Sequence, residues 1–284
     1  METSEEKPDV SVVILTKNGA ETIGRCLESL FNQESSHKFE VIAIDSGSTD
    51  GTLDILGNFQ VRLERIPPSE FNFGGTKNLG FSISKGDIVV FLSQDAIPAG
   101  SNWLERMIAP FEDEGVMIVQ GVDRSGRDGF YWLREGLFWY TSEIKRWLER
   151  YQQIGLSCVT IAIRKTAWEK VKFQTVPFGE DKLFQKNAVE AGMRIVLVDG
   201  TFVEHTHRYT CKSLRKRITN EGLGARISGE DYSFKDMIGD MLNLRIYRYL
   251  VRGMGRGEIR SVGELMFPVV RPFYVYKGAR SFRE

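Results

Sequence analysis

The stretch Asp87-Ile-Val-Val-Phe-Leu-Ser-Gln-Asp-Ala-Ile-Pro98 indicates the fold of the N-terminal part of this chain. Residues 88–92 form a continuous apolar run, which is typical of a strand buried on both faces of an α/β sheet. Asp95 follows the C-terminal end of that strand. Ligands bind at this edge of open α/β sheets, so Asp95 is a candidate site residue. A plain turn aspartate ahead of Pro98 is the alternative that this stretch alone leaves open.

The segments before this strand alternate between short apolar runs and helical patterns. We expect strands at residues 10–15, 39–44 and 61–66, with helices after the first two and another helix over 76–84. Such an alternation predicts a parallel sheet with right-handed crossovers. The chain up to Pro98 therefore has the pattern of a nucleotide-binding half-domain.

The rest of the chain is less regular. Helical patterns begin at Trp103, at Glu180 and after Thr210, and residues 129–151 form one long amphipathic aromatic segment. Further strands are expected at 116–122, 157–163, 195–198 and 201–207.

Composition indicates a globular, cytoplasmic protein. The 284 residues have ordinary apolar and charged fractions, and no apolar run is long enough to span a bilayer. Residues 1–9 are polar and acidic, unlike a signal peptide. The three cysteines are widely separated, which signals neither a disulfide framework nor a zinc site.

The net charge of zero hides an uneven distribution. The chain has 38 Lys/Arg and 38 Asp/Glu. From Arg208 onward there are sixteen Lys/Arg and eight Asp/Glu, so 22 basic and 30 acidic residues precede Arg208. A basic segment of this kind suits nucleic acid, an anionic membrane surface or an anionic substrate. Solvated charge on helices is the equally simple alternative.

Five polar clusters stand near predicted strand ends or helix starts. They are Thr16-Lys17-Asn18, Asp45-Ser46-Gly47-Ser48, Gln94-Asp95, Glu180-Asp181 and His205-Thr206-His207. Each is a weak signal alone. In this order, on an alternating strand and helix pattern, they resemble an inverting glycosyltransferase of family 2 with the GT-A fold, from about Val10 to Tyr209.

Within that family the chain resembles bacterial rhamnosyltransferases. The likeness is carried by residues 41–52, 71–80, 91–98 and 178–181, with Gln-Asp-Ala replacing the usual Asp-x-Asp and Asp-Ser-Gly-Ser replacing Asp-Asp-Gly-Ser. The resemblance implies a mostly parallel central sheet flanked by helices, with a C-terminal helical extension. It implies a donor-binding half over 1–98, an acceptor-binding and catalytic half over 99–210, and a basic helical extension over 211–284.

The resemblance also implies a metal site. Asp95 would hold Mg²⁺ or Mn²⁺ on the donor diphosphate, with Gln94 near the ribose or a phosphate; one carboxylate suffices when phosphate oxygens supply further ligands. His205 and His207 point the same way in an extended segment, so either could complete the metal shell. His207 matches the position of the family's histidine. Two alternatives remain: His205 is the metal ligand instead, or both histidines are only exposed polar residues at a strand end.

Further roles follow from the same resemblance. Glu180 and Asp181 would form the catalytic acidic pair, in which Asp181 is the general base that takes the proton of the acceptor hydroxyl, and a helix N-cap is the alternative. Thr16, Asn18 and Asp45 would line the nucleobase pocket, with Asp45 accepting from the base. Lys77 would reach a phosphate or the base. We expect Ser48 and Thr49 to cap the helix that follows them.

Two other segments allow two interpretations each. Trp132 and Trp139 would share one helical face, which favours core packing over an acceptor platform. Residues 237–254 carry a broad apolar face beside arginines. This face suits peripheral attachment to a membrane near a polyprenyl-linked acceptor, or packing against the body or a second subunit of a homo-oligomer.

The sequence thus predicts a metal-dependent inverting glycosyltransferase that moves rhamnose from dTDP-rhamnose to a glycan or lipid-linked acceptor in cell-surface polysaccharide synthesis. The alternatives are a UDP-hexose-dependent enzyme of the same family and a nucleotide-sugar-binding module without activity. We expect no nucleic-acid partner. A nucleotidyltransferase would need a basic glycine-rich loop, and a Rossmann dehydrogenase a glycine run after the first strand, which Thr16-Lys-Asn-Gly19 does not provide.

Overall fold

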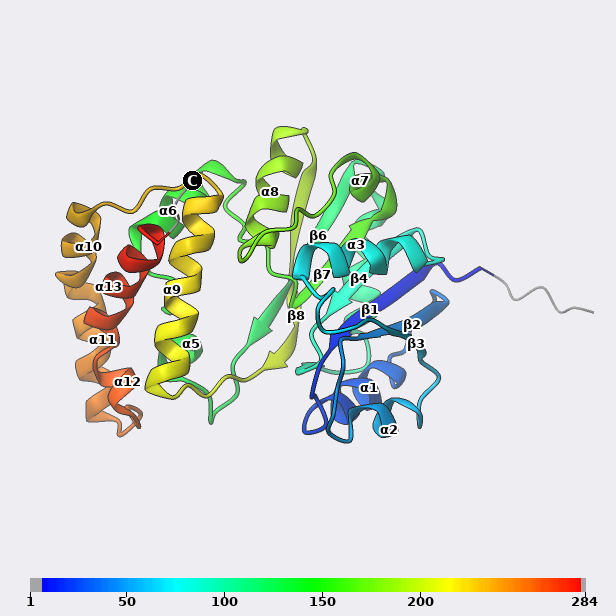
Figure 1. The fold of residues 1–284 in the computed structure, drawn as a ribbon, viewed down its shortest axis with the longest axis horizontal. Helices are drawn as coiled ribbons and strands as arrows, with labels where there is room; N and C mark the ends of the chain where they lie inside the picture. Colours follow the sequence, from blue (N-terminus) through cyan, green and yellow to red (C-terminus); the bar gives the residue numbers. More distant parts are fainter. Residues whose placement is uncertain (1–6, 282–284) are drawn as a thin grey trace, which may run out of the picture. The chain divides into compact units, whose positions relative to one another are not determined.

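Eight strands form one mixed sheet in the computed structural model, which describes residues 7–281 (Figure 1). Residues 1–6 lie outside the described part, and so does most of the polar segment on which the signal-peptide argument rests. The strands are β1 (Val10–Thr16), β2 (Phe39–Asp45), β3 (Arg62–Arg65), β4 (Ile88–Leu92), β5 (Ala96–Pro98), β6 (Val116–Arg124), β7 (Thr160–Arg164) and β8 (Arg194–His205). Their order across the sheet is β3-β2-β1-β4-β7-β6-β8-β5.

The first four strands form the parallel half of the sheet. β1 lies between β2 and β4, and β2 pairs with β3, all in parallel. β4 is buried along its whole length, as its continuous apolar run predicts. The other half begins where β7 pairs with β4 in the antiparallel direction, and β6 and β5 then pair antiparallel with β7 and β8.

The chain divides into two compact units. The first holds the described residues through Asp123, Leu156–Val176 and Phe184–His205, and the second holds Arg124–Gly155, Pro177–Leu183 and the residues from Thr206 onward. The predicted division by function, into residues 1–98, 99–210 and 211–284, stays a prediction. Packing groups the chain differently, because residues 124–155 cluster with the C-terminal helices.

Helices cover the sheet of the first unit. They are α1 (Ile23–Phe31), α2 (Thr52–Leu56), α3 (Phe73–Ile83), α4 (Trp103–Ile108), the 3-10 helix η1 (Ala109–Glu112) and α7 (Lys165–Lys170). α1 buries Ile23, Cys26, Leu27 and Leu30, the face that its sequence periodicity predicts. α3 approaches β1 closely at Gly80, where a Cβ would lie 2.8 Å from Val13 Cγ1. The glycine therefore sets the distance between this helix and the sheet.

The second unit is helical. It contains α5 (Tyr131–Arg134), α6 (Ser142–Arg150), α9 (Cys211–Ile227), α10 (Phe234–Met241), α11 (Leu244–Gly255), α12 (Val262–Leu265) and α13 (Phe267–Ala279), while α8 (Glu180–Glu190) begins in this unit and ends in the first. Figure 1 shows α9 in yellow beside α13 in red. A Cβ at Gly222 would lie 2.1 Å from the Val275 carbonyl oxygen, and one at Gly278 2.0 Å from that of Thr219. The two helices thus touch backbone to backbone at glycines.

Two predictions about elements are wrong. The expected single segment over 129–151 is two short helices, α5 and α6, so Trp132 and Trp139 do not share a helical face. Trp132 is fully buried and donates its indole N–H to the Glu264 carbonyl oxygen, whereas Trp139 is 41% exposed. The two strands expected over 195–207 are one strand, β8, which continues through Asp199 and Gly200. None of the helices within residues 7–281 is long and apolar enough to cross a membrane.

Candidate active site

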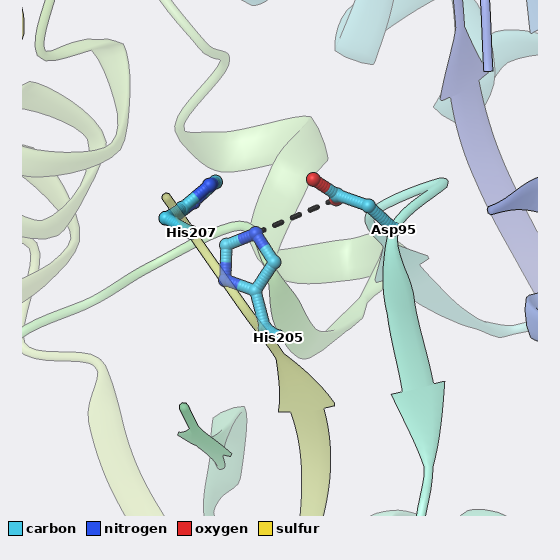
Figure 2. A group of neighbouring side chains, drawn as sticks. All are labelled: Asp95, His205 and His207. Atoms are coloured by element: carbon cyan, nitrogen blue, oxygen red, sulfur yellow. Dashed lines mark ion pairs between the residues drawn. The ribbon is translucent and has the colours of Figure 1, made fainter. Parts of the chain in front are cut away.

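Strand pairing brings Asp95 and His205 together. Asp95 lies between β4 and β5, and the antiparallel register of β5 with β8 sets Ala96 opposite His205. The carboxylate of Asp95 therefore reaches the imidazole, with 3.4 Å between Asp95 Oδ1 and His205 Nε2 (Figure 2). Two residues that are 110 positions apart in the sequence meet because their strands are neighbours.

A second carboxylate holds the other side of the His205 ring. Asp123, near the end of β6, has its Oδ2 3.5 Å from His205 Nδ1. Burial of the ring opposes the charged form, but the hydrogen bonds to Asp123 and Asp95 outweigh it and raise the pKa of His205 to about 9. His205 is buried, while about a third of each carboxylate side chain is exposed. The imidazole is thereby fixed in orientation.

Asp95, His205 and His207 form a group of potential metal ligands. One ligand atom of each lies within 4.8 Å of the others, and Figure 2 shows His207 two residues beyond His205. A carboxylate oxygen with imidazole nitrogens is a donor set that suits a divalent cation, and three protein ligands leave further positions for phosphate oxygens. The residues present fit the predicted Mg²⁺ or Mn²⁺ ion when the ion displaces the proton on His205 Nε2, the nitrogen that faces Asp95, while the Nδ1 proton stays toward Asp123.

Gln94 connects β4 to the loop after β1. Its Oε1 accepts from the Thr16 hydroxyl at 2.6 Å and from the Lys17 backbone N–H at 3.1 Å, and its Nε2 donates to the Lys17 carbonyl oxygen. A Cβ at Gly19 would lie 2.3 Å from Gln94 Oε1, so a larger residue there would displace the Gln94 amide from these bonds. The predicted contact of Gln94 with ribose or phosphate stays a prediction. In this structure its amide orders the loop that precedes α1.

Asp45 orders the loop after β2. The carboxylate is fully buried and accepts from the backbone N–H groups of Gly47 and Ser48, at 2.9 and 3.0 Å, and from the Ser48 hydroxyl. Gly47 has a φ of +90°, in the region that favours glycine. The role of Asp45 as acceptor for a nucleobase stays a prediction.

The loops after β1 and β2 are bonded to each other. The Asn18 backbone N–H donates to Ser48 Oγ at 2.8 Å, and Asn18 Oδ1 accepts from the Thr49 backbone N–H at 2.8 Å. The prediction that Ser48 and Thr49 cap the next helix is wrong, because the N-cap of α2 is Gly51, without a side-chain bond. Ser48 and Thr49 instead join the two loops at the sheet edge.

Lys77 lies on α3 and is buried. Its ammonium group lies 5.2 Å from the centre of the Phe73 ring and 5.5 Å from that of Phe173. Such positions stabilise a cation that has left water. The predicted reach of Lys77 to a phosphate or base stays a prediction.

Glu180 and Asp181 form the first turn of α8, in the part of the helix that belongs to the second unit. Asp181 accepts from the Lys182 backbone N–H at 2.8 Å. The prediction that Glu180 and Asp181 begin a helix is confirmed. Carboxylates in a first turn are stabilised by the backbone N–H groups at the helix N-terminus. The catalytic role of Asp181 stays a prediction.

Beside Asp181 lies a group of charges in the second unit, Glu143, Lys182, Glu221 and Arg271, of which Lys182 is half-buried and the other three are buried. We call this group the buried ionic cluster. Arg271 is fully buried and donates to Glu221 Oε2 at 2.8 Å. Burial raises the pKa of Glu143 and lowers that of Lys182. Neighbouring opposite charges shift both pKa values the other way, but burial has the larger effect. Burial also opposes ionisation of Glu221, but Arg271 and Arg217 keep its pKa below the ordinary value. The cluster fixes the start of α8 next to Asp181.

Comparison with known families identifies the class of protein. A sequence profile of the family described as "Glycosyl transferase family 2" matches residues 11–171, more than half of the chain. The chain belongs to glycosyl transferase family 2 and is a glycosyltransferase, as its motifs predicted.

Named relatives add detail. The chain is 27% identical over 233 residues to the O-antigen chain rhamnosyltransferase WbaN of Salmonella anatum, covering 76% of this chain and 72% of the relative. It is 24% identical over 225 residues to RfbN of Salmonella typhimurium, another O-antigen chain rhamnosyltransferase, covering 75% and 71%. The predicted relation to rhamnosyltransferases is confirmed.

Solved structures confirm the fold. A mannosyltransferase of Pyrobaculum calidifontis in complex with GDP-Man and Mn²⁺ aligns with a TM-score of 0.65 at 16% identity, over 98% of this chain and 87% of the other. Glucosyl-3-phosphoglycerate synthase of Mycobacterium tuberculosis aligns with a TM-score of 0.58 at 18% identity, over 77% and 76%. The predicted GT-A fold with its C-terminal helices is therefore correct.

Asp123 is the one residue of this site that the motifs did not indicate. It directly follows the strand predicted over 116–122, so the strand-end argument that selected Asp95 applies to it equally. The neighbouring positions of β6 and β8 in the sheet could not be deduced from the alternation of elements. A rule applied to every strand end would have included Asp123.

Proposed function

We propose that this glycosyltransferase transfers rhamnose from dTDP-rhamnose to a glycan or lipid-linked acceptor in cell-surface polysaccharide synthesis, with inversion and with a divalent cation. The observation that carries the proposal is the group of Asp95, His205 and His207 at the end of the parallel half-sheet. Two relatives named as O-antigen chain rhamnosyltransferases, each matched over about three quarters of this chain, support the sugar and the pathway class.

Asp95 and the histidines would hold Mg²⁺ or Mn²⁺, which when bound neutralises charge on the departing diphosphate. The chain's own contribution is to fix the ligands before the donor arrives. Asp123 keeps the His205 ring oriented from one side, while β5 and β8 hold Asp95 opposite. A preformed donor set lowers the reorganisation that transfer requires.

The donor nucleoside would lie against the joined loops after β1 and β2. Thr16 and Gln94 are bonded to each other, and Asn18 is bonded to the loop of Asp45. These bonds order a continuous polar rim at the carboxyl ends of β1, β2 and β4, which is where ligands bind in such sheets. Lys77 would act on the same donor as a positive charge.

Asp181 would accept the proton of the acceptor hydroxyl as that oxygen attacks the sugar carbon. Attack forms the new glycosidic bond while the bond to the diphosphate breaks, and the carboxylate receives the proton. Glu180 precedes it in the same helical turn, is largely buried and would complete the catalytic acidic pair.

A donor comparison tests the proposal. The purified enzyme is incubated with dTDP-rhamnose, UDP-glucose or GDP-mannose, each with Mn²⁺ and with a chelator. Release of the nucleotide is measured as the sugar is transferred to water in place of the acceptor hydroxyl. We expect release of dTDP from dTDP-rhamnose to be fastest, to need the metal and to be lost in Asp95→Asn. The matched control is Asp54→Asn, an exposed carboxylate on α2. Faster release of UDP would give the UDP-hexose alternative, and release from none would contradict the proposal.

A further inference from the structure

The helices α10 to α13 present an unusual amount of apolar surface to solvent. Eleven of the fifteen large apolar side chains that are exposed among the described residues belong to residues 234–273. The most exposed are Leu244 and Leu242, at 71% and 69%, at the corner between α10 and α11. Exposed apolar residues concentrated in one segment mark a surface that meets something other than water.

α11 has two distinct faces. Ile246, Leu250 and Gly253 are buried in the core of the second unit. Leu244 and Val251 are seven residues apart and exposed, so they share the outward face, with Arg248 between them. Packing against the body of the protein, one of the two interpretations of residues 237–254, therefore accounts for only the buried side of this helix. The outward side, defined by Leu244, Arg248 and Val251 with the corner residue Leu242, is the apolar-basic face.

Charge on this segment is one-sided at the surface. Between residues 234 and 280 eight of the nine basic side chains are exposed, and none of the four acidic ones is. The exposed bases are Lys235, Arg245, Arg248, Arg252, Arg256, Arg260, Lys277 and Arg280. Arg260 and Arg280 have acidic neighbours, Asp128 and Asp231.

Three of the four acidic groups of the segment make hydrogen bonds inside the unit. Asp240 accepts from Tyr232 and Ser142, Glu264 accepts from the Tyr131 backbone N–H, and Asp236 caps α10 at Ser233. Their charges are thus used for internal bonds. The segment offers solvent a basic surface interrupted by apolar side chains.

We propose that the apolar-basic face of α10 and α11 binds the surface of an anionic lipid bilayer. Apolar side chains that project among arginines match the acyl boundary and the anionic headgroups of such a surface. A second copy of the chain is a poor partner, because a symmetric contact would set the same arginines against each other. A bilayer of neutral lipid would leave the positive charge of these arginines uncompensated. This inference does not depend on the identity of the donor sugar.

Sedimentation of the full-length enzyme with vesicles tests the proposal. Vesicles of phosphatidylcholine alone are compared with an equal mixture of phosphatidylcholine and phosphatidylglycerol. We expect binding to the mixed vesicles, weakened by added salt, and little binding to phosphatidylcholine. Arg245→Gln with Arg248→Gln should weaken binding about fivefold per arginine removed. Leu244→Glu with Val251→Glu should abolish it.

Matched controls lie in the first unit. Leu63→Glu with Leu197→Glu changes two exposed apolar residues of the sheet, and Arg25→Gln with Arg65→Gln removes two exposed bases. Both control variants should bind mixed vesicles as the wild type does, and far-ultraviolet circular dichroism checks that every variant is folded. Nucleotide release should be unchanged in the α11 variants, which separates this inference from the proposed function.

Three outcomes would overturn the proposal. They are absence of binding to mixed vesicles, equal binding to neutral vesicles, and equal loss in the control variants. A wild-type dimer that Leu244→Glu with Val251→Glu converts to a monomer, without vesicle binding, would make the face a subunit interface instead.

Discussion

The strand-end loops of the first unit and the buried ionic cluster of the second both fix polar or charged side chains, but by different means. In the loops, Asp45 and Gln94 are held by backbone groups and hydroxyls within the loops that follow their own and neighbouring strands. In the cluster, Glu221 and Arg271 come from different helices and compensate each other away from water. The bonds in the loops form once the local turns are correct, whereas those in the cluster form only when the helices of the second unit are packed together.

This difference predicts how the two regions respond to substitution. A half-exposed carboxylate such as Asp95 or Asp181 can be replaced with little effect on folding, because its partners can bond to water. Removal of one member of a buried pair leaves a charge that water cannot reach. Activity should therefore depend on the strand ends and on Asp181, and stability on the cluster.

The largest expected effect is that of Asp181→Asn on turnover. Loss of the general base should lower the transfer rate by about three orders of magnitude. Donor affinity should stay within about twofold of wild type, since the side chain is assigned to the acceptor. Glu190→Gln, at the exposed end of the same helix, is the control and should be neutral. Wild-type turnover in Asp181→Asn would remove the base assignment.

Arg271→Met should have the largest effect on stability. The change removes the fully buried partner of Glu221 and leaves it only the partly exposed Arg217, which should lower the free energy of unfolding by about 3 kcal/mol. Denaturant unfolding measures it. Arg280→Met, which removes an exposed arginine 3.8 Å from Asp231, should cost less than about 1 kcal/mol.

A double variant sharpens this result. Glu221→Gln with Arg271→Met should be more stable than Arg271→Met alone, because the buried side chain at 221 is then neutral, while Arg217, which loses its partner, is partly exposed to water. Equal stability of the two variants would show that packing of Arg271 over the Phe138 ring, at 5.0 Å, is what matters.

Asp123→Asn should have a moderate effect on the metal site. Loss of the carboxylate that orients His205 should weaken Mn²⁺ affinity by about 10–100-fold, measured by calorimetry. Asp199→Asn, an exposed change within β8, is the control. Unchanged affinity in Asp123→Asn would mean that His205 does not need this orientation.

The smallest expected effect concerns Glu105 at the surface of the first unit. Hydrogen bonds from Ser35 and Ser36 lower its pKa below the ordinary value of 4.5. Because the folded pKa is lowered, the stabilisation is present above 4.5 and is lost as the pH falls through the folded value. The stability difference between wild type and Glu105→Gln should shrink from neutral pH to about pH 3. A difference that grew on acidification would contradict this assignment.

The sequence predicts the parallel half-sheet and the strand-end residues well because their signals are local. The apolar run of β4 and the polar clusters after β1, β2 and β4 each lie within a dozen residues. The pairing of β5 with β8 joins residues more than a hundred positions apart, so the contact of Asp95 with His205 could be predicted only through the family resemblance.

The second unit was less predictable for a physical reason. Helical periodicity shows that a face is apolar without showing what covers it, so α11 could be read as packed or as membrane-facing. The glycines Gly222 and Gly278, which let α9 and α13 touch, give no local signal of their partner. The buried charges were also missed, since Glu143 and Arg271 resemble ordinary solvated residues in the sequence.

The most direct test of the central claim is calorimetric titration of dTDP into wild type and Asp95→Asn, with Mn²⁺ and with a chelator. Asp95 as metal ligand on the donor diphosphate predicts binding by the wild type with Mn²⁺, and loss of that binding in the chelator and in the variant. Binding of dTDP that is indifferent both to the metal and to Asp95→Asn would contradict the account.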